Sequence, residues 1–244
     1  MDAELRKSLD RFFSPKSLAI VGVSGLYSGN AGEFLLRNLL RANFPGRIYL
    51  VDPVAQEMTG LRIYPKISNL PEAIDLAIIC VPADFVSSAL AEFAQNAIRN
   101  IHILTSGFKE LATSHGLSLE KEIQNEISKG QLNVIGPNCI GPYVPASPLM
   151  LWGQIPASPG ALAFLSQDDY LSARMTKYAH FMGCGISKAL SFGSPALLDS
   201  TDFLEYLAED GETKVIGMYL EGVRDGRRFL QVANRVNRIK PLVI

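Results

Sequence analysis

The sequence predicts an α/β fold in which buried parallel strands alternate with amphipathic helices. Short apolar runs and helical patterns alternate along a chain of 244 residues, which is long enough for one large domain or two smaller ones. Hydrophobic residues make up 48% of the sequence and charged residues 19%. The mean hydropathy of +0.15 fits strands that helices cover on both faces.

The first half contains five apolar runs that we expect to be strands. They cover residues 18–21, 48–51, 76–81, 101–104 and 134–135, and helical patterns at 33–42, 85–97 and 117–127 lie between them. Right-handed crossovers join strands of this kind into one parallel sheet. We therefore expect a Rossmann-like domain over residues 1–145, with its ligand edge at the carboxyl ends of the strands.

A proline-rich segment separates this half from the next. Residues 142–159 hold five of the 14 prolines and the only tryptophan, Trp152, which indicates a domain boundary or an ordered crossover. Strand patterns then return at 161–165, 189–192, 215–220 and 242–244, with helical patterns at 171–182, 203–208 and 228–236. These predict a second α/β domain over residues 146–244. Because its last apolar run coincides with the last residue, we expect this domain to be cut short or completed by another chain.

The turn after the first predicted strand has the composition of a phosphate-binding loop. Residues 18–32 read LAIVGVSGLYSGNAG, a buried strand that ends in Gly22 and is followed by small residues and a helical pattern. Such a turn points backbone N–H groups and a helix N-terminus at one spot, and glycine lets a phosphate approach the backbone closely. The spacing of glycines 22, 25, 29 and 32 does not meet the dinucleotide pattern GxGxxG. A purely structural turn is the alternative.

The other strand ends of the first half carry small residues, prolines and amides. They read DP at 52–53, VPA at 81–83, TSGFKE at 105–110 and GPNCIGP at 136–142. Histidine and carboxylates are scarce there, so these strand ends offer few side chains for acid–base catalysis. Backbone shape and hydrogen bonding suit a long, thin, partly apolar ligand, and we expect this domain to bind a ligand and not to carry out chemistry.

Charge, hydropathy and cysteine usage exclude other classes. The formal net charge of −1 gives no electrostatic case for nucleic acid or an anionic membrane. No apolar run reaches the length of a membrane span, and the charged N-terminus shows no secretory signal. Three widely separated cysteines, Cys80, Cys139 and Cys184, indicate reduced thiols in a cytoplasmic protein.

Taken together, the motifs resemble those of a known family. SPKSLAIVGVS, IYLVDP, VPA, TSGFKE and GPNCIG follow one another in the first half, and LAFLSQ, SFG, LEYLAED, KVIGMYLEG and RRFLQVA in the second. This order resembles the NDP-forming acyl-CoA synthetases, which include the ADP-forming acetate–CoA ligases and the succinyl-CoA synthetase α-subunits. The resemblance runs from Phe12 onward. It implies a Rossmann-like coenzyme A-binding domain, followed by a partial flavodoxin-like domain of the succinyl-CoA synthetase type.

The resemblance also implies roles for individual residues. A first group would lie along the phosphates of coenzyme A, Pro53 would border the adenine, a second group would line the pantetheine arm, and a third would lie near the thiol. The phosphate group is Gly22, Ser24, Gly25 and Asn30; the pantetheine group is Val81, Pro82 and Ala83; the thiol group is Thr105, Ser106, Gly107, Asn138 and Cys139. Without a basic partner, the thiol of Cys139 is better explained as a packed structural group than as a nucleophile.

Two positions near the nucleotide end depart from the family pattern. Val54 stands where the family usually has a lysine, and Asp52 replaces the commoner asparagine. The missing cation could be replaced by Lys16, Arg62 or Lys66. A carboxylate at the end of the second strand is also typical of an NAD ribose site, so an NAD-binding domain stays open as an alternative.

The phosphoryl-transfer part of the family mechanism is expected to be incomplete. In the family, a histidine loop beyond the fourth strand of the second domain carries the phosphate, and the sequence stops at that strand. We expect His102, His115 and His180 to be structural or surface residues. We also expect the acidic pair Asp168 and Asp169 to cap a helix and to disfavour a phosphate there. Glu221 matches the glutamate that supports the phosphohistidine, and no metal site is expected.

These observations leave several functions open. The main expectation is a protein that binds coenzyme A or acyl-CoA, resembles the α part of the ligases and is not catalytically complete alone. Alternatives are a working ligase α part that needs a β-subunit, an ATP-grasp domain or a second copy, the regulatory module of a lysine acetyltransferase, and the NAD-binding domain. The sequence does not identify the acyl group.

Overall fold

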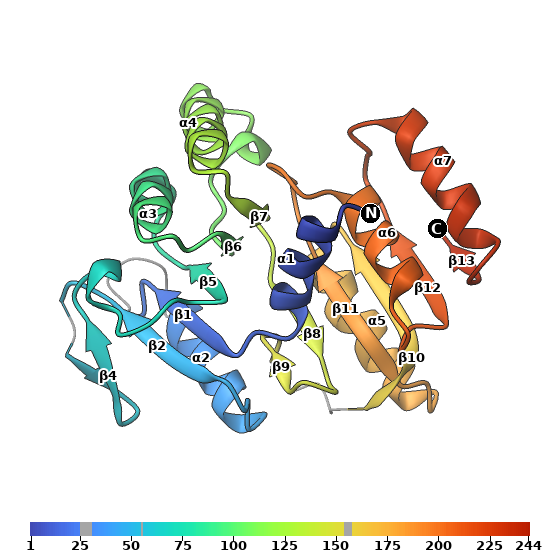
Figure 1. Cartoon of the computed structure of the whole chain (residues 1–244), viewed down its shortest axis with the longest axis horizontal. Helices are drawn as coiled ribbons and strands as arrows, with labels where there is room; N and C mark the ends of the chain where they lie inside the picture. The colour runs from blue at the N-terminus through green and yellow to red at the C-terminus, as the bar shows by residue number, and fades with distance from the viewer. Residues whose placement is uncertain (25–30, 55, 154–157) are drawn as a thin grey trace.

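The chain folds into two mostly parallel sheets that lie side by side, each with helices on its faces (Figure 1). The structure, a computed structural model, describes residues 1–24, 31–54, 56–153 and 158–244. The prediction of an α/β architecture with two such units is confirmed. Among the described residues, no helix is long and apolar enough to cross a membrane.

The first sheet has the strand order β3-β4-β2-β1-β5-β6-β7. All its neighbouring strands pair in parallel except the short β3, which runs antiparallel to β4. Without β3 this is the doubly wound order 3-2-1-4-5-6, whose ligand crevice lies where the order reverses, beside β1. The strands are β1 (Ser17–Val21), β2 (Arg47–Val51), β3 (Glu57–Met58), β4 (Leu61–Tyr64), β5 (Leu76–Ile79), β6 (Asn100–Ile103) and β7 (Asn133–Ile135).

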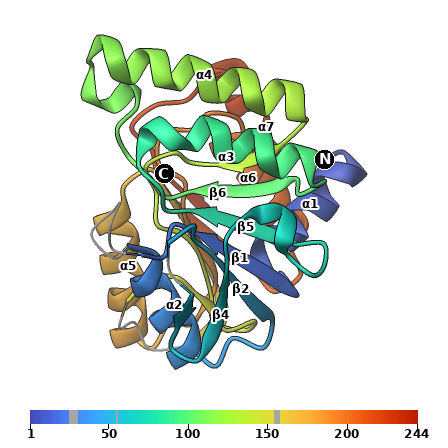
Figure 2. The same ribbon diagram turned by 90° about the vertical axis from the view of Figure 1, so that its left-hand side faces the viewer.

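Helices cover both faces of this sheet (Figure 2). In β1, Leu18 and Ile20 pack on the side of α2, whereas Ala19 and Val21 pack on the side of α3 and α4. Side chains of a strand alternate between the two faces, so every residue of β1 must be apolar or small to be buried. The helices are α2 (Ala31–Arg41), α3 (Ala83–Gln95) and α4 (Ser114–Gly130), with 3₁₀ turns η1 (Ile67–Asn69) and η2 (Lys109–Leu111).

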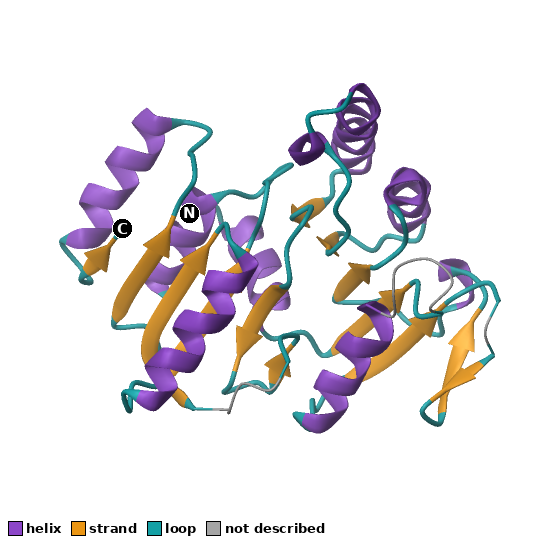
Figure 3. Ribbon diagram, turned by 180° about the vertical axis from the view of Figure 1, so that it is seen from behind, coloured by secondary structure: helices purple, strands orange, loops and turns teal. Residues whose placement is uncertain are grey.

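The second sheet has the order β13-β12-β10-β11-β8-β9. Its four parallel strands follow the flavodoxin-like order 2-1-3-4, and α5 lies on the same side of the molecule as α2 (Figure 3). The strands are β8 (Gly141–Val144), β9 (Leu149–Met150), β10 (Pro159–Ser166), β11 (Ile186–Ser191), β12 (Val215–Tyr219) and β13 (Leu242–Val243). The helices are α5 (Asp169–Phe181), α6 (Ser200–Glu209) and α7 (Gly226–Asn237).

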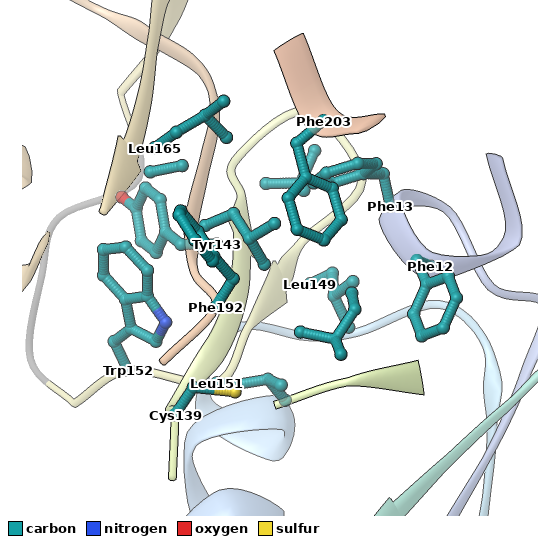
Figure 4. Close-up of a cluster of buried hydrophobic side chains, with 14 of the residues drawn as sticks. Phe12, Phe13, Cys139, Tyr143, Leu149, Leu151, Trp152, Leu165, Phe192 and Phe203 are labelled. Atoms are coloured by element: carbon teal, nitrogen blue, oxygen red, sulfur yellow. The ribbon is translucent and has the colours of Figure 1, made fainter. Parts of the chain in front are cut away.

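Two features at the junction of the sheets differ from the expectation of purely parallel strands. The proline-rich segment supplies β8 and β9, which add antiparallel strands beside β11. The N-terminal residues form a further helix, α1 (Ala3–Phe13), which buries Leu9, Phe12 and Phe13 completely. Side chains from both regions fill the space between the sheets (Figure 4). Trp152 lies there, and its indole N–H donates a hydrogen bond to the carbonyl oxygen of Gly141 at 2.9 Å.

Candidate functional site

The carboxyl ends of the parallel strands in the first sheet form one connected edge. The N–H of Gly22, after β1, donates to the carbonyl oxygen of Val51 in β2 at 3.0 Å. The hydroxyl of Thr105, after β6, donates to the carbonyl oxygen of Val81 at 2.6 Å. The N–H of Asn138 donates to the carbonyl oxygen of Thr105 at 2.9 Å. These bonds bring predicted site residues from four strand ends into one row.

A side chain cannot be accommodated at Gly22, the first residue of this row. Its φ is +88°, and a Cβ atom would lie 2.8 Å from Cγ1 of Val81 and 3.0 Å from the backbone of Cys80. Gly32, in α2, is equally restricted, because its Cβ would lie 2.6 Å from the carbonyl oxygen of Gly22. The two glycines therefore let the start of α2 pack directly on the end of β1, as a nucleotide-binding turn requires.

A cavity of about 310 Å³ opens beside this turn, at the ends of β1, β2 and β5. Its volume is at the lower end of the range for small-molecule sites. Three residues that the sequence analysis assigned to the site, Gly22, Pro53 and Val81, line it. The remaining wall comes from α3 and from the segment after β4, including Phe85, Ser88, Ala89, Glu92, Lys66 and Ile67. Strand β4 was not predicted from the sequence, and of the residues after it only Lys66 was offered there as a candidate for the site.

Asp52 faces the glycine turn and not the solvent. Its side chain is only 1% exposed. One carboxylate oxygen accepts hydrogen bonds from the N–H of Ser24 at 2.9 Å and from the Ser24 hydroxyl at 2.7 Å, and the other accepts from the N–H of Val54 at 3.0 Å. A carboxylate buried against protein donors stabilises the turn. It is therefore poorly placed to receive the ribose diol on which the NAD interpretation depends.

The other predicted residues continue the row toward the second sheet. Pro82 and Ala83 begin α3, and the Cβ of Ala83 lies 3.1 Å from where a side chain of Gly107 would start. Gly107 has a φ of +115° and donates its N–H to the Glu110 carboxylate at 2.6 Å. Ser106 is exposed beside it. Gly25 and Asn30 lie outside the described residues.

Cys139 and His102 are packed inside the protein, behind this row. The thiol of Cys139 is 1% exposed, and burial raises its pKa well above the usual value. The ring of His102 is completely buried, and its Nε2–H donates to the carbonyl oxygen of Cys139 at 2.8 Å. Burial lowers the pKa of His102 to about 4. Both side chains are therefore neutral at pH 7 and do not face the row.

The row continues into the second sheet through Asp169. This carboxylate accepts hydrogen bonds from the N–H of Ile140 at 3.0 Å and from the hydroxyl of Ser191. Burial raises the pKa of Asp169, and the bonds from Ser191 and Ile140 oppose that rise. Its neighbour Asp168 caps α5 by accepting the N–H of Leu171. The capping role expected of the acidic pair thus belongs to Asp168, whereas Asp169 connects two strand-end loops to α5.

Glu221 lies at the far end of the row, after β12. Its N–H and that of Gly222 donate to the side-chain oxygen of Gln167 at 2.5 and 3.0 Å. The Glu221 side chain is exposed, and no cation of the described part of the chain forms an ion pair with it. The described residues contain no group of three or more His, Cys, Asp or Glu side chains that could hold a metal ion.

The two histidines outside the core have single polar partners. Nε2 of His115, at the start of α4, lies 2.9 Å from the carboxylate of Asp84, at the start of α3, and both side chains are exposed. Nδ1 of His180, near the end of α5, lies 2.5 Å from the hydroxyl of Ser158. His180 is therefore at the opposite end of α5 from Asp168 and Asp169.

Comparison with known proteins gives two family matches that together cover most of the chain. The family described as "CoA binding domain" matches residues 16–145. The family described as "Succinyl-CoA ligase like flavodoxin domain" matches residues 159–244. The first match includes the glycine turn and the cavity, and the second includes Asp169 and Glu221.

Curated relatives and solved structures agree with these matches. The chain is 38% identical over 237 residues to acetate–CoA ligase [ADP-forming] I of Archaeoglobus fulgidus, covering 97% of this chain and 34% of that protein. It is 34% identical over 242 residues to the α-subunit of acetate–CoA ligase [ADP-forming] I of Pyrococcus furiosus, covering 97% and 52%. The apo dinucleotide-forming acetyl-coenzyme A synthetase 1 of Ca. Korarchaeum cryptofilum superposes with a TM-score of 0.87 at 34% identity, covering 96% and 51%. The chain thus spans about a third to a half of the length of these relatives.

Proposed function

Because this chain belongs to the family of NDP-forming acyl-CoA synthetases and resembles their α part, we propose that it binds coenzyme A along the strand ends of its first sheet. The observation that carries this proposal is the cavity beside Gly22, at the crossing point of the strand order. That is where doubly wound sheets bind nucleotides. The positive φ of Gly22 and the contacts that a Cβ atom would make with Val81 and Cys80 support a tight turn between β1 and α2, the kind of turn that nucleotide-binding sheets use.

Each part of coenzyme A has a proposed place on this row. The cavity with Pro53 would take the adenosine end. Gly22 and Ser24 would lie along the phosphates, together with Gly25 and Asn30 outside the described residues. Val81, Pro82 and Ala83 would line the pantetheine arm, and Thr105, Ser106, Gly107 and Asn138 would lie near the thiol. We propose that Cys139 contributes through its main chain, because its thiol faces the core.

We further propose that the chain acts with other protein parts as an acid–thiol ligase. In that reaction acyl-CoA, phosphate and a nucleoside diphosphate yield the acid, coenzyme A with its thiol free, and a nucleoside triphosphate. Relatives named as α-subunits support a partner chain for the nucleotide-handling part. We propose that Glu221 supports a phosphate-carrying group there, since its exposed carboxylate lies on the same edge.

The proposal is tested by filling the cavity without disturbing the core. Ser88 is exposed on α3 and lines the cavity. Replacing it with tyrosine should weaken coenzyme A binding about tenfold or more, because the larger side chain takes the space of the ligand. Ser128 is exposed on α4 and does not line the cavity, so Ser128→Tyr is the matched control and should bind like the wild type. Isothermal titration calorimetry gives the dissociation constant of coenzyme A for the wild type and for both variants.

The same calorimetric titrations can contradict the proposal. No heat from coenzyme A at millimolar concentration, with a folded protein by circular dichroism, would exclude a coenzyme A site. Heat from NAD without heat from coenzyme A would instead support the NAD-binding alternative, against the buried position of Asp52. Equal affinity in wild type and Ser88→Tyr would move the site away from the cavity.

A further inference from the structure

The cavity beside Gly22 has an apolar lining and three charged residues at its rim. Val21, Val51, Ile67 and Ala89 provide apolar surface, which suits a flat heteroaromatic base. The charged residues are Asp52, Glu92 and Lys66. Two carboxylates and one ammonium would give the rim a net negative charge if all three faced a ligand equally.

The two carboxylates, however, are engaged by the protein. Asp52 accepts hydrogen bonds from Ser24 and Val54. Glu92 accepts the N–H groups of Ile67 and Ser68 through one oxygen, at 3.0 and 3.3 Å. Carboxylates that accept several N–H bonds have their charge partly compensated locally. Neither carboxylate needs a cation from the ligand side.

Lys66 is in the opposite situation. It is exposed two residues after the end of β4, and no acidic residue in the described ranges forms an ion pair with it. It precedes η1 without a side-chain capping bond. Its ammonium group is therefore available to an anion at the cavity rim, and a substitution would remove no side-chain hydrogen bond or ion pair with the described residues.

Of the cations in the described part of the chain, only Lys66 lines this cavity. Lys16 directly precedes β1 and thus lies at the opposite edge of the sheet, where its N–H donates to Asp75. The guanidinium of Arg62 lies over the ring of Tyr64, 5.0 Å from its centroid. The turn between β3 and β4 returns the chain so that β4 runs parallel to β2. The segment after β4 thereby carries Lys66 to the cavity.

We propose that Lys66 recognises a phosphate group on the ribose of the adenosine whose base occupies this cavity. The inference rests on the proposed function: for coenzyme A the group is the 3′-phosphate. An ammonium donates charge-assisted hydrogen bonds to phosphate oxygens. The chain then distinguishes a phosphorylated adenosine ligand from the same ligand without that phosphate. The cation that does so comes from the segment after β4 and not from position 54, where the family usually has a lysine and this chain has valine.

The test compares coenzyme A with 3′-dephospho-coenzyme A by isothermal titration calorimetry at low ionic strength. Lys66→Ala should weaken the binding of coenzyme A about tenfold and change that of dephospho-coenzyme A by less than about twofold. Lys66→Arg, which keeps a cation, should retain most of the affinity. Lys16→Ala removes an exposed lysine at the opposite edge and should leave both affinities unchanged.

Three results would overturn the role of Lys66. They are an equal loss for both ligands in Lys66→Ala, no loss for coenzyme A, and a wild type that binds both ligands equally well. In each case coenzyme A still binds the wild type, so the proposed function survives. A wild type that binds neither ligand overturns the proposed function, and the role of Lys66 with it.

Discussion

Phe13→Ala is expected to lower the free energy of unfolding by about 3–5 kcal/mol, the range for removing a fully buried aromatic side chain. Phe13 is completely buried at the end of α1 and stacks on Tyr206 of α6 with ring centroids 5.0 Å apart. Figure 4 shows it beside Phe203, in the cluster that fills the space between the two sheets. The cavity left by alanine would open at the junction that holds the sheets side by side.

Urea denaturation followed by the fluorescence of Trp152 measures this effect, because the only tryptophan lies in the same cluster. The matched control is Phe181→Ala. Phe181 is 72% exposed at the end of α5, and its loss should change stability by no more than about 0.5 kcal/mol. A Phe13→Ala protein within about 1 kcal/mol of the wild type would contradict the packing of α1 against the second sheet.

Acidification from pH 6.5 to pH 4 is expected to cost about 3 kcal/mol of stability through His102 alone. Burial lowers the pKa of His102 from 6.5 to about 4 in the folded state, and its Nδ1 has no hydrogen-bond partner among the described residues. Between pH 6.5 and pH 4, the unfolded chain therefore binds a proton at His102 that the folded protein does not bind. The contribution is fully present above pH 6.5 and is lost progressively as the pH falls through this window.

His102→Gln removes the titrating group, so the difference in stability between wild type and variant should shrink or reverse as the pH falls from 6.5 to 4. Asp169 acts in the opposite direction, because burial raises its pKa and its protonation favours the folded state at low pH. Asp169 is present in both proteins, so its effect cancels in the difference between their free energies of unfolding and the effect of His102 remains. If the free energy of unfolding of His102→Gln fell with pH as steeply as that of the wild type, a buried neutral ring at position 102 would be contradicted.

The parallel strands were predictable because their residues must be apolar on both faces. In β1 the alternation of Leu18 and Ile20 with Ala19 and Val21 serves two helix layers, and this gives a continuous apolar run. By contrast, five of the eleven residues of α1 are charged, and its buried residues follow a helical spacing that forms no continuous apolar run. Strand β8 was not predicted because prolines 142, 145 and 148 are unfavourable in a strand. The pairing of β9 with β8 involves only Tyr143 and Val144, so it needs no N–H from Pro142.

The row of strand ends followed from the topology, but the orientation of its charged groups did not. The sequence analysis read Asp52 as a group facing the ligand, whereas its hydrogen bonds to Ser24 turn it toward the loop. Three cations were equal candidates from the sequence, and their positions in the fold separate them: Lys16 precedes β1, Arg62 lies over a tyrosine ring, and Lys66 lines the cavity. Asp169 likewise belongs with Ile140 and Ser191, contacts that depend on the arrangement of both sheets.

Hydrogen exchange with and without coenzyme A shows at which edge of the first sheet the coenzyme binds. A larger cleft of about 890 Å³ lies at the opposite edge of the first sheet, lined by Lys7, Arg11, Arg99 and Asn133 among others. We predict that coenzyme A slows amide exchange in residues 22–24, 66–68, 81–83 and 105–107 and leaves residues 3–8 and 131–133 unchanged. Protection confined to the cleft at the opposite edge, with no change at the strand ends, would contradict this account.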